Sequence, residues 1–589
     1  MGKKSNAKKL SREVPVIQTK KDSKKALKAM KAFSKVKEHA KKYVNKQTIF
    51  GGVLTLIMLT LLISVGFLLF NKAFKPQPIA KILPSDRVIA ALEINTNFEH
   101  SQVIKTMDLL KRYPEYSKTT LLKYIETKFG VNYDQDLKPW LGRSIGMAFM
   151  DSQKEKGSVY ELYFAEINNE QKALQFFNKN KKVNYGGHDV YTIKPTAYVT
   201  FINNYVFISP GEDGIYELID AENDGKPTLY DSDKYRRIDD NLPVNKVAFL
   251  YIDFEKINNG FIKYFPAISE QNMSIEVLAP FFKIFKSEGF ALIALDNNFV
   301  VQSFLSLDAN KMKNSEFITF KEKYKARLTD FVATDTLAFW GGKNLEYQMK
   351  RIVDVFASGN EDANSFITAL IQNYVQKYFG SDVNFRTDIL PLFKNEFALA
   401  VEQIEGRNVY KILIELDNPE DEEEVLSNIA ENFVKSGGVF NPQIIDHTLP
   451  DGTLSREIIA VPEEIQKIDS TYKDIPIRGL KIGKKDWGIY YAVINKIAVV
   501  ATHIEGIKST IDIDKGTKNS LQSTALFNYQ IAPILENSDE ITYFNFKKLS
   551  PILFDENPLN KYLKPIESFS SGKNYFNDGI VTINYLHID

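Results

Sequence analysis

The hydrophobic positions of the chain follow three successive patterns. From Ser23 to Val44, apolar residues recur at steps of three and four between lysines, which predicts a basic amphipathic helix. Ile49–Phe70 is then an apolar run without a charged residue. As a helix this run would reach about 33 Å, enough to cross the hydrocarbon core of a bilayer. The sequence therefore predicts a transmembrane helix, followed by a long tail of mixed periodicity.

Beyond residue 82 the pattern changes repeatedly between a period of two and a period near 3.6. β-branched and aromatic residues at strand length predict strands at Arg87–Ile94, Ile145–Met150, Val159–Ile167, Tyr198–Ser209 and Phe299–Leu307. Helical spacing predicts helices at Val103–Tyr113, Thr119–Phe129 and Ile275–Phe285. Because strands follow one another through short turns, these elements favour antiparallel meanders with helices packed on one face, an α+β architecture.

The tail also resembles itself. The segment VNYDQDLKPWL at 131–141 aligns without a gap with VNFRTDILPLF at 383–393, and YIDFEKI at 251–257 aligns with YFNFKKL at 543–549. Such self-similarity predicts two tandem copies of one antiparallel-sheet-plus-helices unit. The predicted domains are a basic head with an amphipathic helix (1–48), the transmembrane helix (49–70), a linker (71–81), repeat one (82–308), a helical connector (309–332) and repeat two (333–589).

Charge is distributed unevenly between the two sides of the apolar run. Residues 1–48 hold 16 basic and 3 acidic residues; because the whole chain has 75 and 74, the part after Phe70 holds 59 and 71. A basic flank predicts a cytoplasmic N-terminus, with the repeats on the outer side of the membrane. The run is too long, and its flank too bulky and charged, for a cleaved signal peptide, so we expect an uncleaved signal anchor.

Two partners follow from this arrangement, and one is disfavoured. Ile49–Phe70 would bind the lipid bilayer. The Lys-rich head would either bind anionic lipids of the inner leaflet or only set the topology, and the sequence leaves both interpretations open. The mildly acidic tail argues against nucleic acid as a partner, because phosphate binding needs positive surface.

Candidate chemistry is sparse. The chain has no cysteine, which excludes disulfides, thiolate nucleophiles and Cys-ligated metals. The six histidines, at positions 39, 100, 188, 447, 503 and 587, form no helical pair and no H-E-x-x-H motif. Segment 132–136 has oxygen-bearing side chains like a calcium loop, but Leu137 and Arg143 stand at its glycine and carboxylate positions. We therefore assign no catalytic, cofactor-binding or metal-binding residue.

Asp136 and Asp388 occupy equivalent positions in the two copies, each with a proline three residues later. The structural interpretation is an Asx-turn or helix cap that holds the chain before a hairpin. Whether either aspartate does more is left open.

Several motifs together resemble a known family. They are LPSD at 83–86 opening a strand, DLKPWLG at 136–142 before a hairpin, the turn YGGHDVY at 185–191, and the single apolar run ahead of them. The chain resembles the bacterial family called domain of unknown function 3352. Repeat two departs from this pattern, with Ala333-Thr334-Asp335 at the LPSD position and Leu392 in place of the tryptophan. The resemblance implies a bacterial, membrane-anchored, extracytoplasmic protein and supplies no activity.

Three functional hypotheses remain. The first is a single-pass binding or scaffold protein of the cell envelope whose repeats hold an unknown protein or polymer. The second is a carrier or chaperone for a lipid or other apolar ligand, which a continuous apolar cavity would favour. The third is a hydrolase of envelope polymers with unidentified carboxylates, which two facing desolvated carboxylates would favour.

Overall fold

The structure is a computed structural model. It describes residues 78–589 except 114–121, 124–125, 128–131, 154–157, 178–180, 194–196, 258–283, 312–323, 350–360, 380–382, 436–439, 449–453, 463, 484–486, 536–537, 555–562 and 577. The basic head and the apolar run Ile49–Phe70 lie outside these residues. Within them, no helix is long and apolar enough to cross a membrane.

The chain divides into two compact units. Unit 1 comprises residues 1–97 and 131–245, and unit 2 comprises residues 98–130 and 246–589. We describe each unit by itself. Both are built on antiparallel strands with helices packed against them, which confirms the α+β class.

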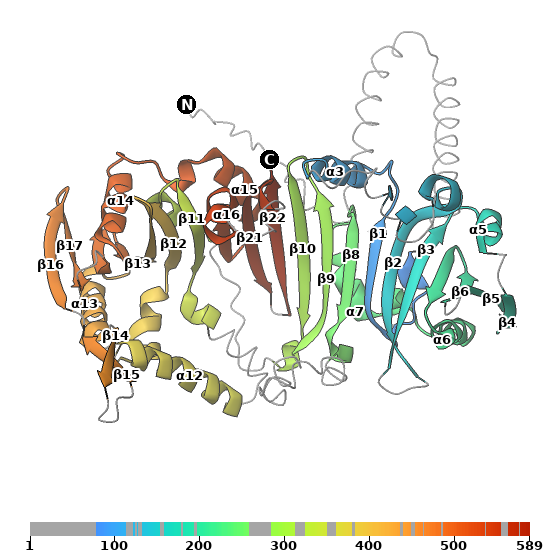
Figure 1. The fold of residues 1–589 in the computed structure, drawn as a ribbon, viewed down its shortest axis with the longest axis horizontal. Coiled ribbons are helices and arrows are strands. Elements are labelled where there is room, and N and C mark those ends of the chain that lie inside the picture. Colours follow the sequence, from blue (N-terminus) through green and yellow to red (C-terminus); the bar gives the residue numbers. More distant parts are fainter. Residues whose placement is uncertain are drawn as a thin grey trace, which may run out of the picture. The chain divides into compact units, whose positions relative to one another are not determined.

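Unit 1 has seven described strands (Figure 1). They are hydrogen-bonded antiparallel in the order β1-β2-β3-β7-β6-β5-β4. Their bounds are β1 Val88–Asn95, β2 Leu141–Asp151, β3 Val159–Ile167, β4 Lys181–Tyr185, β5 His188–Ile193, β6 Ala197–Ile202 and β7 Tyr205–Ser209. The helices are α5 (Glu170–Phe177), α6 (Glu212–Asn223) and α7 (Asp233–Asp240). Because α6 packs against β3, β6 and β7, the alternate residues that face it, such as Leu162 and Phe207, are fully buried.

Unit 2 has thirteen strands in one hydrogen-bonded series among its described residues. Their order is β8-β9-β10-β22-β21-β20-β11-β12-β13-β19-β18-β17-β16, antiparallel throughout. The bounds are β8 Ala248–Asp253, β9 Phe285–Ala294, β10 Asn298–Leu307, β11 Thr336–Lys343, β12 Glu396–Ile404, β13 Arg407–Glu415, β16 Ile465–Tyr472, β17 Ile475–Ile482, β18 Gly488–Ile494, β19 Ile497–Ala501, β20 Glu540–Phe544, β21 Ile566–Phe576 and β22 Gly579–Ile588. A separate hairpin pairs β14 (Phe440–Thr448) with β15 (Leu454–Pro462).

The six described helices of unit 2 are α3 Ser101–Leu110, α12 Glu361–Phe379, α13 Pro419–Lys435, α14 Ile504–Asp514, α15 Ala525–Leu535 and α16 Phe546–Phe554. Five of the six pack against this series of strands, and α12 packs against α13. Two of them pack against the same end of the series, α14 against β12, β13, β17, β18 and β19, and α13 against β17 and β18. At the other end α3 packs against β9, where Leu109, Ala294 and Ile588 are fully buried together.

The two units share a pattern of connection. The order β1-β2-β3-β7-β6-β5-β4 in unit 1 has the same connectivity as β11-β12-β13-β19-β18-β17-β16 in unit 2. A helix follows the third strand in each, α5 or α13, and another follows the last strand, α6 or α14. The strand register gives the equivalent positions in the two units. Ala148 of β2 pairs with Leu162 of β3, and Ala400 of β12 pairs with Lys411 of β13. Ala400 is therefore equivalent to Ala148, and Lys411 to Leu162.

Several predicted elements can be compared with observed ones. Val159–Ile167 is confirmed as β3, and Tyr198–Ser209 is confirmed as the hairpin β6–β7. The helix expected at Val103–Tyr113 is α3, which begins two residues earlier. The helix expected at Ile275–Phe285 is wrong at its last residue, because Phe285 begins strand β9; residues 275–283 lie outside the description. Most of Thr119–Phe129 also lies outside it. The described ends of the connector 309–332 are short 3-10 turns, η5 (Ala309–Lys311) and η6 (Arg327–Phe331).

Candidate functional site

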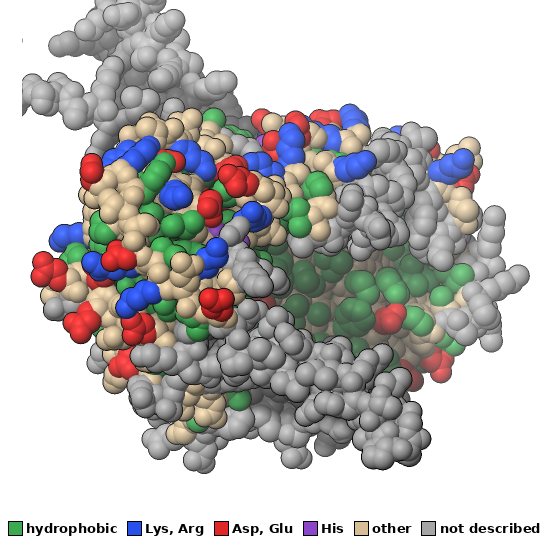
Figure 2. All heavy atoms as spheres, turned by 60° about the vertical axis from the view of Figure 1, so that its left-hand side comes forward, with side chains coloured by type: hydrophobic (Ala, Val, Ile, Leu, Met, Phe, Trp, Pro, Cys, Tyr) green, Lys and Arg blue, Asp and Glu red, His purple; other side chains and the backbone are tan. Residues whose placement is uncertain are grey.

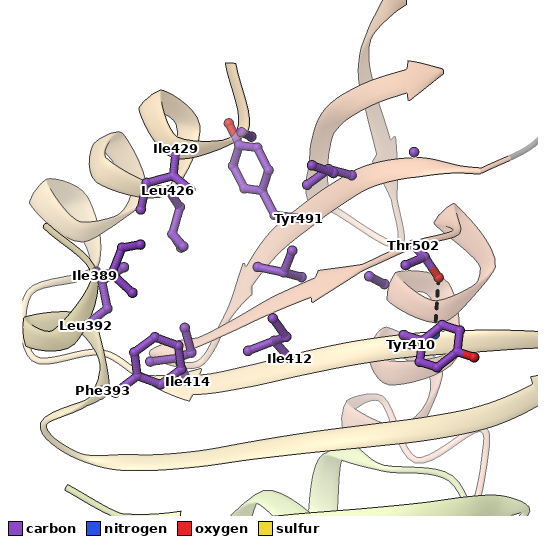
Figure 3. Close-up of a pocket in the computed structure, with 15 residues that line it drawn as sticks. Ile389, Leu392, Phe393, Tyr410, Ile412, Ile414, Leu426, Ile429, Tyr491 and Thr502 are labelled. Atoms are coloured by element: carbon purple, nitrogen blue, oxygen red, sulfur yellow. Dashed lines mark hydrogen bonds between the residues drawn. The ribbon is translucent and has the colours of Figure 1, made fainter. Parts of the chain in front are cut away.

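An apolar cavity of about 300 Å³ lies in unit 2 between helix α13 and one face of the strands β13, β18 and β19 (Figure 3). Figure 3 shows Ile412 and Ile414 rising from β13 on one side, with Leu426 and Ile429 of α13 on the other. The remaining wall residues are Ile389, Leu392, Phe393, Tyr410, Ala430, Gly488, Ile489, Tyr491, Val500, Ala501 and Thr502. None of these side chains carries a charge, so the cavity suits an apolar ligand.

The strands supply their wall through simple alternation. In β13, Tyr410, Ile412 and Ile414 are spaced by two residues and therefore lie on one face of the sheet. Ile412 pairs with Val500 of β19, and Val500 pairs with Tyr491 of β18, so three neighbouring strands present apolar side chains in one row. Within β13, the N–H of Tyr410 donates to Oγ1 of Thr502 at 3.1 Å (Figure 3).

The end of the cavity is closed by a short turn whose conformation is set by polar side chains. Residues Phe385–Ile389 form the π-helical turn η7, and Leu390–Phe393 form the 3-10 turn η8. The side chain of Asn384 caps η7 by accepting from the N–H groups of Arg386 and Thr387. The carboxylate of Asp388 accepts from the N–H of Asn384 at 2.8 Å. This turn directs Leu392 and Phe393 toward β13 (Figure 3).

Unit 1 has the same elements at the equivalent place, and there the space is filled. Trp140 follows η3 (Tyr133–Leu137) as Leu392 follows η7. Its indole contacts Phe176 and Phe177 of α5 with ring centroids 5.8 Å away in each case, and its Nε1 donates to the carbonyl of Asp136 at 2.6 Å. Phe201 packs against Phe177 from the sheet side. Aromatic rings thus occupy in unit 1 the space that is open in unit 2.

Each unit has a buried ion pair, between two strands in unit 2 and between Arg87, just before β1, and helix α6 in unit 1. In unit 2 the Nζ of Lys411 lies 2.7 Å from Oε1 of Glu402, and neither side chain is exposed. In unit 1 an Nη of Arg87 lies 2.8 Å from Oε2 of Glu217 on α6. Counted from the equivalent strands β7 and β19, Ser509 of α14 occupies the position of Glu217 in α6. The Oγ of Ser509 donates to Oε2 of Glu402 at 3.3 Å. These pairs hold the fold together and do not line the cavity.

Four carboxyl groups among the described residues, those of Glu166, Glu288, Asp330 and Glu396, have a raised pKa because burial disfavours their charged form. Burial raises the pKa of Glu288 and that of Glu396 to about 7, against the opposing effects of a hydrogen bond from Ser303 to Glu288 and from the Leu328 N–H to Glu396. Burial also raises the pKa of Glu166, which accepts from the N–H of Arg143 at 2.6 Å. None of the four lines the described cavity, and no carboxyl group or histidine is among its wall residues.

The aspartates singled out from the sequence make the same local bond in both units. The carboxylate of Asp136 accepts from the N–H of Asn132 at 2.7 Å, as that of Asp388 does from Asn384. Asp134 pairs with Lys138 at 3.3 Å across the same turn. The N-cap of each turn is the asparagine, Asn132 or Asn384, and the aspartate expected to cap the turn bonds back to the N–H of that asparagine. Among the described residues no cluster of three or more His, Asp or Glu side chains has the geometry of a metal site.

Each histidine whose side chain is described makes its own local contact. His100 Nδ1 accepts from the Gln102 N–H at the start of α3, and His188 Nε2 lies 3.0 Å from a Glu222 carboxylate oxygen. His503 contacts Thr502, and His587 contacts Asn298. Burial lowers the pKa of His587. His39 lies outside the described residues, and so does the side chain of His447.

Sequence reasoning did not find the cavity. Its residues are ordinary aliphatic positions of a sheet and a helix, and periodicity marks them only as core. The one available signal was the exchange of Trp140 for Leu392 between otherwise aligned segments, because the smaller side chain leaves space unfilled.

Comparison with known proteins gives one extended match. A family model described as "Protein of unknown function (DUF3352)" matches residues 49–443. No curated protein matches the chain. Among solved structures, crystal form III of TP0453 is 10% identical with a TM-score of 0.23, covering 43% of this chain and 84% of that chain. Crystal form IV of TP0453 is 11% identical with a TM-score of 0.22, covering 39% and 81%. These scores support no inference about this chain.

Proposed function

This chain belongs to the family of proteins of unknown function DUF3352, and from that premise we propose that it is a binding protein of the bacterial cell envelope that holds an apolar chain in unit 2. The apolar cavity of about 300 Å³ carries this proposal. Sites for small ligands run from roughly 300 to 1,000 Å³ and bury most of the ligand in apolar walls. The cavity is at the small end of this range, which suits one hydrocarbon chain.

The broader hypothesis was an envelope scaffold for an unknown protein or polymer. Here the protein keeps its membrane anchor, and its ligand is a hydrocarbon chain. The proposal also takes up the carrier hypothesis, for which a continuous apolar cavity was the expected sign. An envelope-polymer hydrolase gains no support from the cavity, because no carboxylate is among its wall residues.

We propose that the anchor is Ile49–Phe70, with the Lys-rich head in the cytoplasm beside anionic inner-leaflet lipids and the two units outside. The apolar run and the excess of basic residues before it support this placement. Since the chain has no cysteine, single-cysteine variants can test it. A membrane-impermeant maleimide should label Asp233→Cys, at a side chain 94% exposed, in intact cells. Ser5→Cys should be labelled only after lysis, and the reverse result would overturn the placement.

We also propose that the two sets of strands are copies of one ancestral unit, repeat one at 82–308 and repeat two at 333–589. The equal connectivity of the seven strands in each unit and the gap-free match of 131–141 with 383–393 support this. If so, the copies have diverged at Trp140 and Leu392, and the second copy has a cavity where the indole of Trp140 packs against Phe176 and Phe177 in the first.

Photo-crosslinking in membranes tests the proposed function on the full chain. A palmitic acid with a diazirine in its tail is added to membranes that contain the protein, and labelled peptides are mapped by mass spectrometry. Labels should fall on segments that line the cavity, such as Ile412–Ile414 and Leu426–Ala430. Labels only in Ile49–Phe70 or on unit 1 would contradict the proposal.

Leu392→Trp provides the decisive variant, because unit 1 already accommodates a tryptophan at the equivalent place. The indole should fill the cavity and lower cavity labelling at least about tenfold, a change of about 1.4 kcal/mol in binding. Ile104→Trp is the matched control, since Ile104 is 46% exposed on α3 and lies outside the cavity wall. Labelling that survives Leu392→Trp would show that the probe is bound elsewhere.

A further inference from the structure

A second hollow, of about 310 Å³ and polar, adjoins the apolar cavity. Ala430 of α13 and Tyr491 of β18 line both spaces. The polar hollow is otherwise lined by Ser427, Glu431, Lys467, Ile468, Asp469, Arg478, Gly479 and Leu480. A ligand that passes Tyr491 would therefore leave an aliphatic wall and meet charged side chains.

The register of the strands explains this change. Across five neighbouring strands, one row of directly paired residues reads Ile412, Val500, Tyr491, Arg478 and Asp469. Directly paired residues of an antiparallel sheet point to the same face. Neighbouring strands lie about 4.8 Å apart, so the row changes from aliphatic to charged within roughly 10 Å. Helix α13 lies over both spaces, with Leu426 and Ile429 on the first and Ser427 and Glu431 on the second.

The charges of the polar hollow are balanced. Lys467 and Arg478 contribute two positive charges, and Glu431 and Asp469 contribute two negative charges. Lys467 Nζ lies 3.1 Å from Glu431 Oε1, and Arg478 pairs with Glu423 of α13. The Lys467 and Arg478 side chains are 78% and 48% exposed, and exposed ion pairs exchange partners at little cost. Figure 2, which brings this side of unit 2 forward, shows acidic and basic side chains interspersed on the nearer surface.

We infer that the ligand of unit 2 is a single-chain amphiphile with a zwitterionic head group, its hydrocarbon chain in the apolar cavity and its head in the polar hollow. This rests on the proposed function and adds the chemistry of the head. A phosphate would lie by Lys467 and Arg478, and an ammonium by Glu431 and Asp469. A purely anionic head would face the two carboxylates of the hollow and Glu423 beside it, and a purely cationic head would face the two basic side chains. The size of the cavity favours one chain over two.

The test uses the full chain reconstituted in phosphatidylglycerol vesicles, which contain no zwitterionic lipid. The diazirine-bearing palmitic acid labels the cavity, and three competitors with the same palmitoyl-length chain displace it. They are lysophosphatidylethanolamine, lysophosphatidylglycerol and hexadecanol. We expect the zwitterionic compound to displace the probe at a concentration at least about tenfold below either of the others.

Variants in the polar hollow separate the contribution of the head group to binding from that of the hydrocarbon chain. In the double variant Lys467→Gln/Arg478→Gln, the advantage of lysophosphatidylethanolamine should fall to within about twofold of hexadecanol, whose own displacement should not change. Lys105→Gln is the matched control, because it removes an exposed ion-paired lysine on α3 and should leave the preference intact.

The outcomes distinguish the two proposals. Equal displacement by all three competitors would overturn the zwitterionic head while keeping the apolar site. The strongest displacement by lysophosphatidylglycerol would overturn it in favour of an anionic head. Dipalmitoyl phosphatidylethanolamine, added as a fourth competitor, tests the number of chains, and displacement equal to that by lysophosphatidylethanolamine would overturn the single-chain assignment. A probe that never labels the cavity in any vesicle would overturn the proposed function itself.

Discussion

The Nζ of Lys411 lies 2.7 Å from Oε1 of Glu402, with both side chains completely buried in unit 2. Burial lowers the pKa of Lys411, and the charge of Glu402 opposes this effect. Oε1 of Glu402 also accepts from the N–H of Ala333 at 2.9 Å. The pair therefore joins β12 and β13 to the segment that enters β11.

Lys411→Met should destabilise unit 2 by about 3–5 kcal/mol, because it leaves the buried charge of Glu402 without its partner. Denaturant unfolding of the variant against the wild type measures this loss. Lys473→Met is the control: Lys473 pairs with Asp512 at 2.7 Å at an exposed position, and its loss should cost far less than that of Lys411. Equal costs for the two variants would mean that the Lys411 pair is not desolvated.

Asp388→Ala should cost about 1 kcal/mol of stability without abolishing probe binding. Its carboxylate satisfies the N–H of Asn384 at the start of η7, a capping bond typically worth about this much. Asp136→Ala should cost a similar amount in unit 1, where the same bond is made to Asn132. Chemical unfolding measures both losses, and photo-crosslinking measures binding. Complete loss of labelling in folded Asp388→Ala protein would give this aspartate a role in the site.

The pH dependence of stability should carry a contribution from Glu396. Its side chain is almost fully buried near Arg327 and Glu415, and burial raises its pKa from 4.5 to about 7. Between these two values the folded protein binds more protons than the unfolded chain, so stability should fall as the pH rises from about 4 to 7 and change little from this group above it. The loss amounts to at most about 3 kcal/mol.

Unfolding of the wild type and of Glu396→Gln at pH 5 and pH 8 checks this sign. The wild type should lose more stability than the variant between the two pH values, since the amide does not titrate. Glu161→Gln, at an exposed position of β3, should keep the wild-type difference. If Glu396→Gln is as pH-sensitive as the wild type, the carboxyl group does not titrate in this range.

Local sequence patterns predicted the strands and helices better than they predicted the cavity and the strand pairing around it. Val159–Ile167 is rich in aromatic and β-branched residues at strand length, with buried and exposed positions alternating through its middle, so its bounds could be read directly. Phe285 was misassigned because apolar residues in Ile275–Phe285 satisfy helical spacing up to the residue where strand β9 begins. The pairing Arg478–Tyr491, which joins the two hollows, depends on register between strands and has no signature in either segment alone.

Trp140→Leu should create in unit 1 the cavity that unit 2 already has. The indole contacts Phe176 and Phe177 and is 4% exposed, so its removal leaves unfilled space as well as an unused carbonyl of Asp136. We expect a loss of about 2–4 kcal/mol, within the range for large-to-small changes of buried residues. Leu392→Trp should cost much less or even stabilise unit 2, because its indole enters existing space and finds the equivalent carbonyl of Asp388.

Unfolding of the two variants and of the double exchange Trp140→Leu/Leu392→Trp measures this asymmetry. The effects should add, since the two positions belong to different compact units. Trp140→Leu should also give the diazirine-bearing palmitic acid a second labelled region, on α5 and β6, if an apolar cavity is sufficient to capture the chain. If Trp140→Leu is destabilised but gains no new label, binding of the hydrocarbon chain also needs the charged residues Arg478 and Asp469 beyond Tyr491. The equivalent row in unit 1 ends instead in Tyr191 and Lys182.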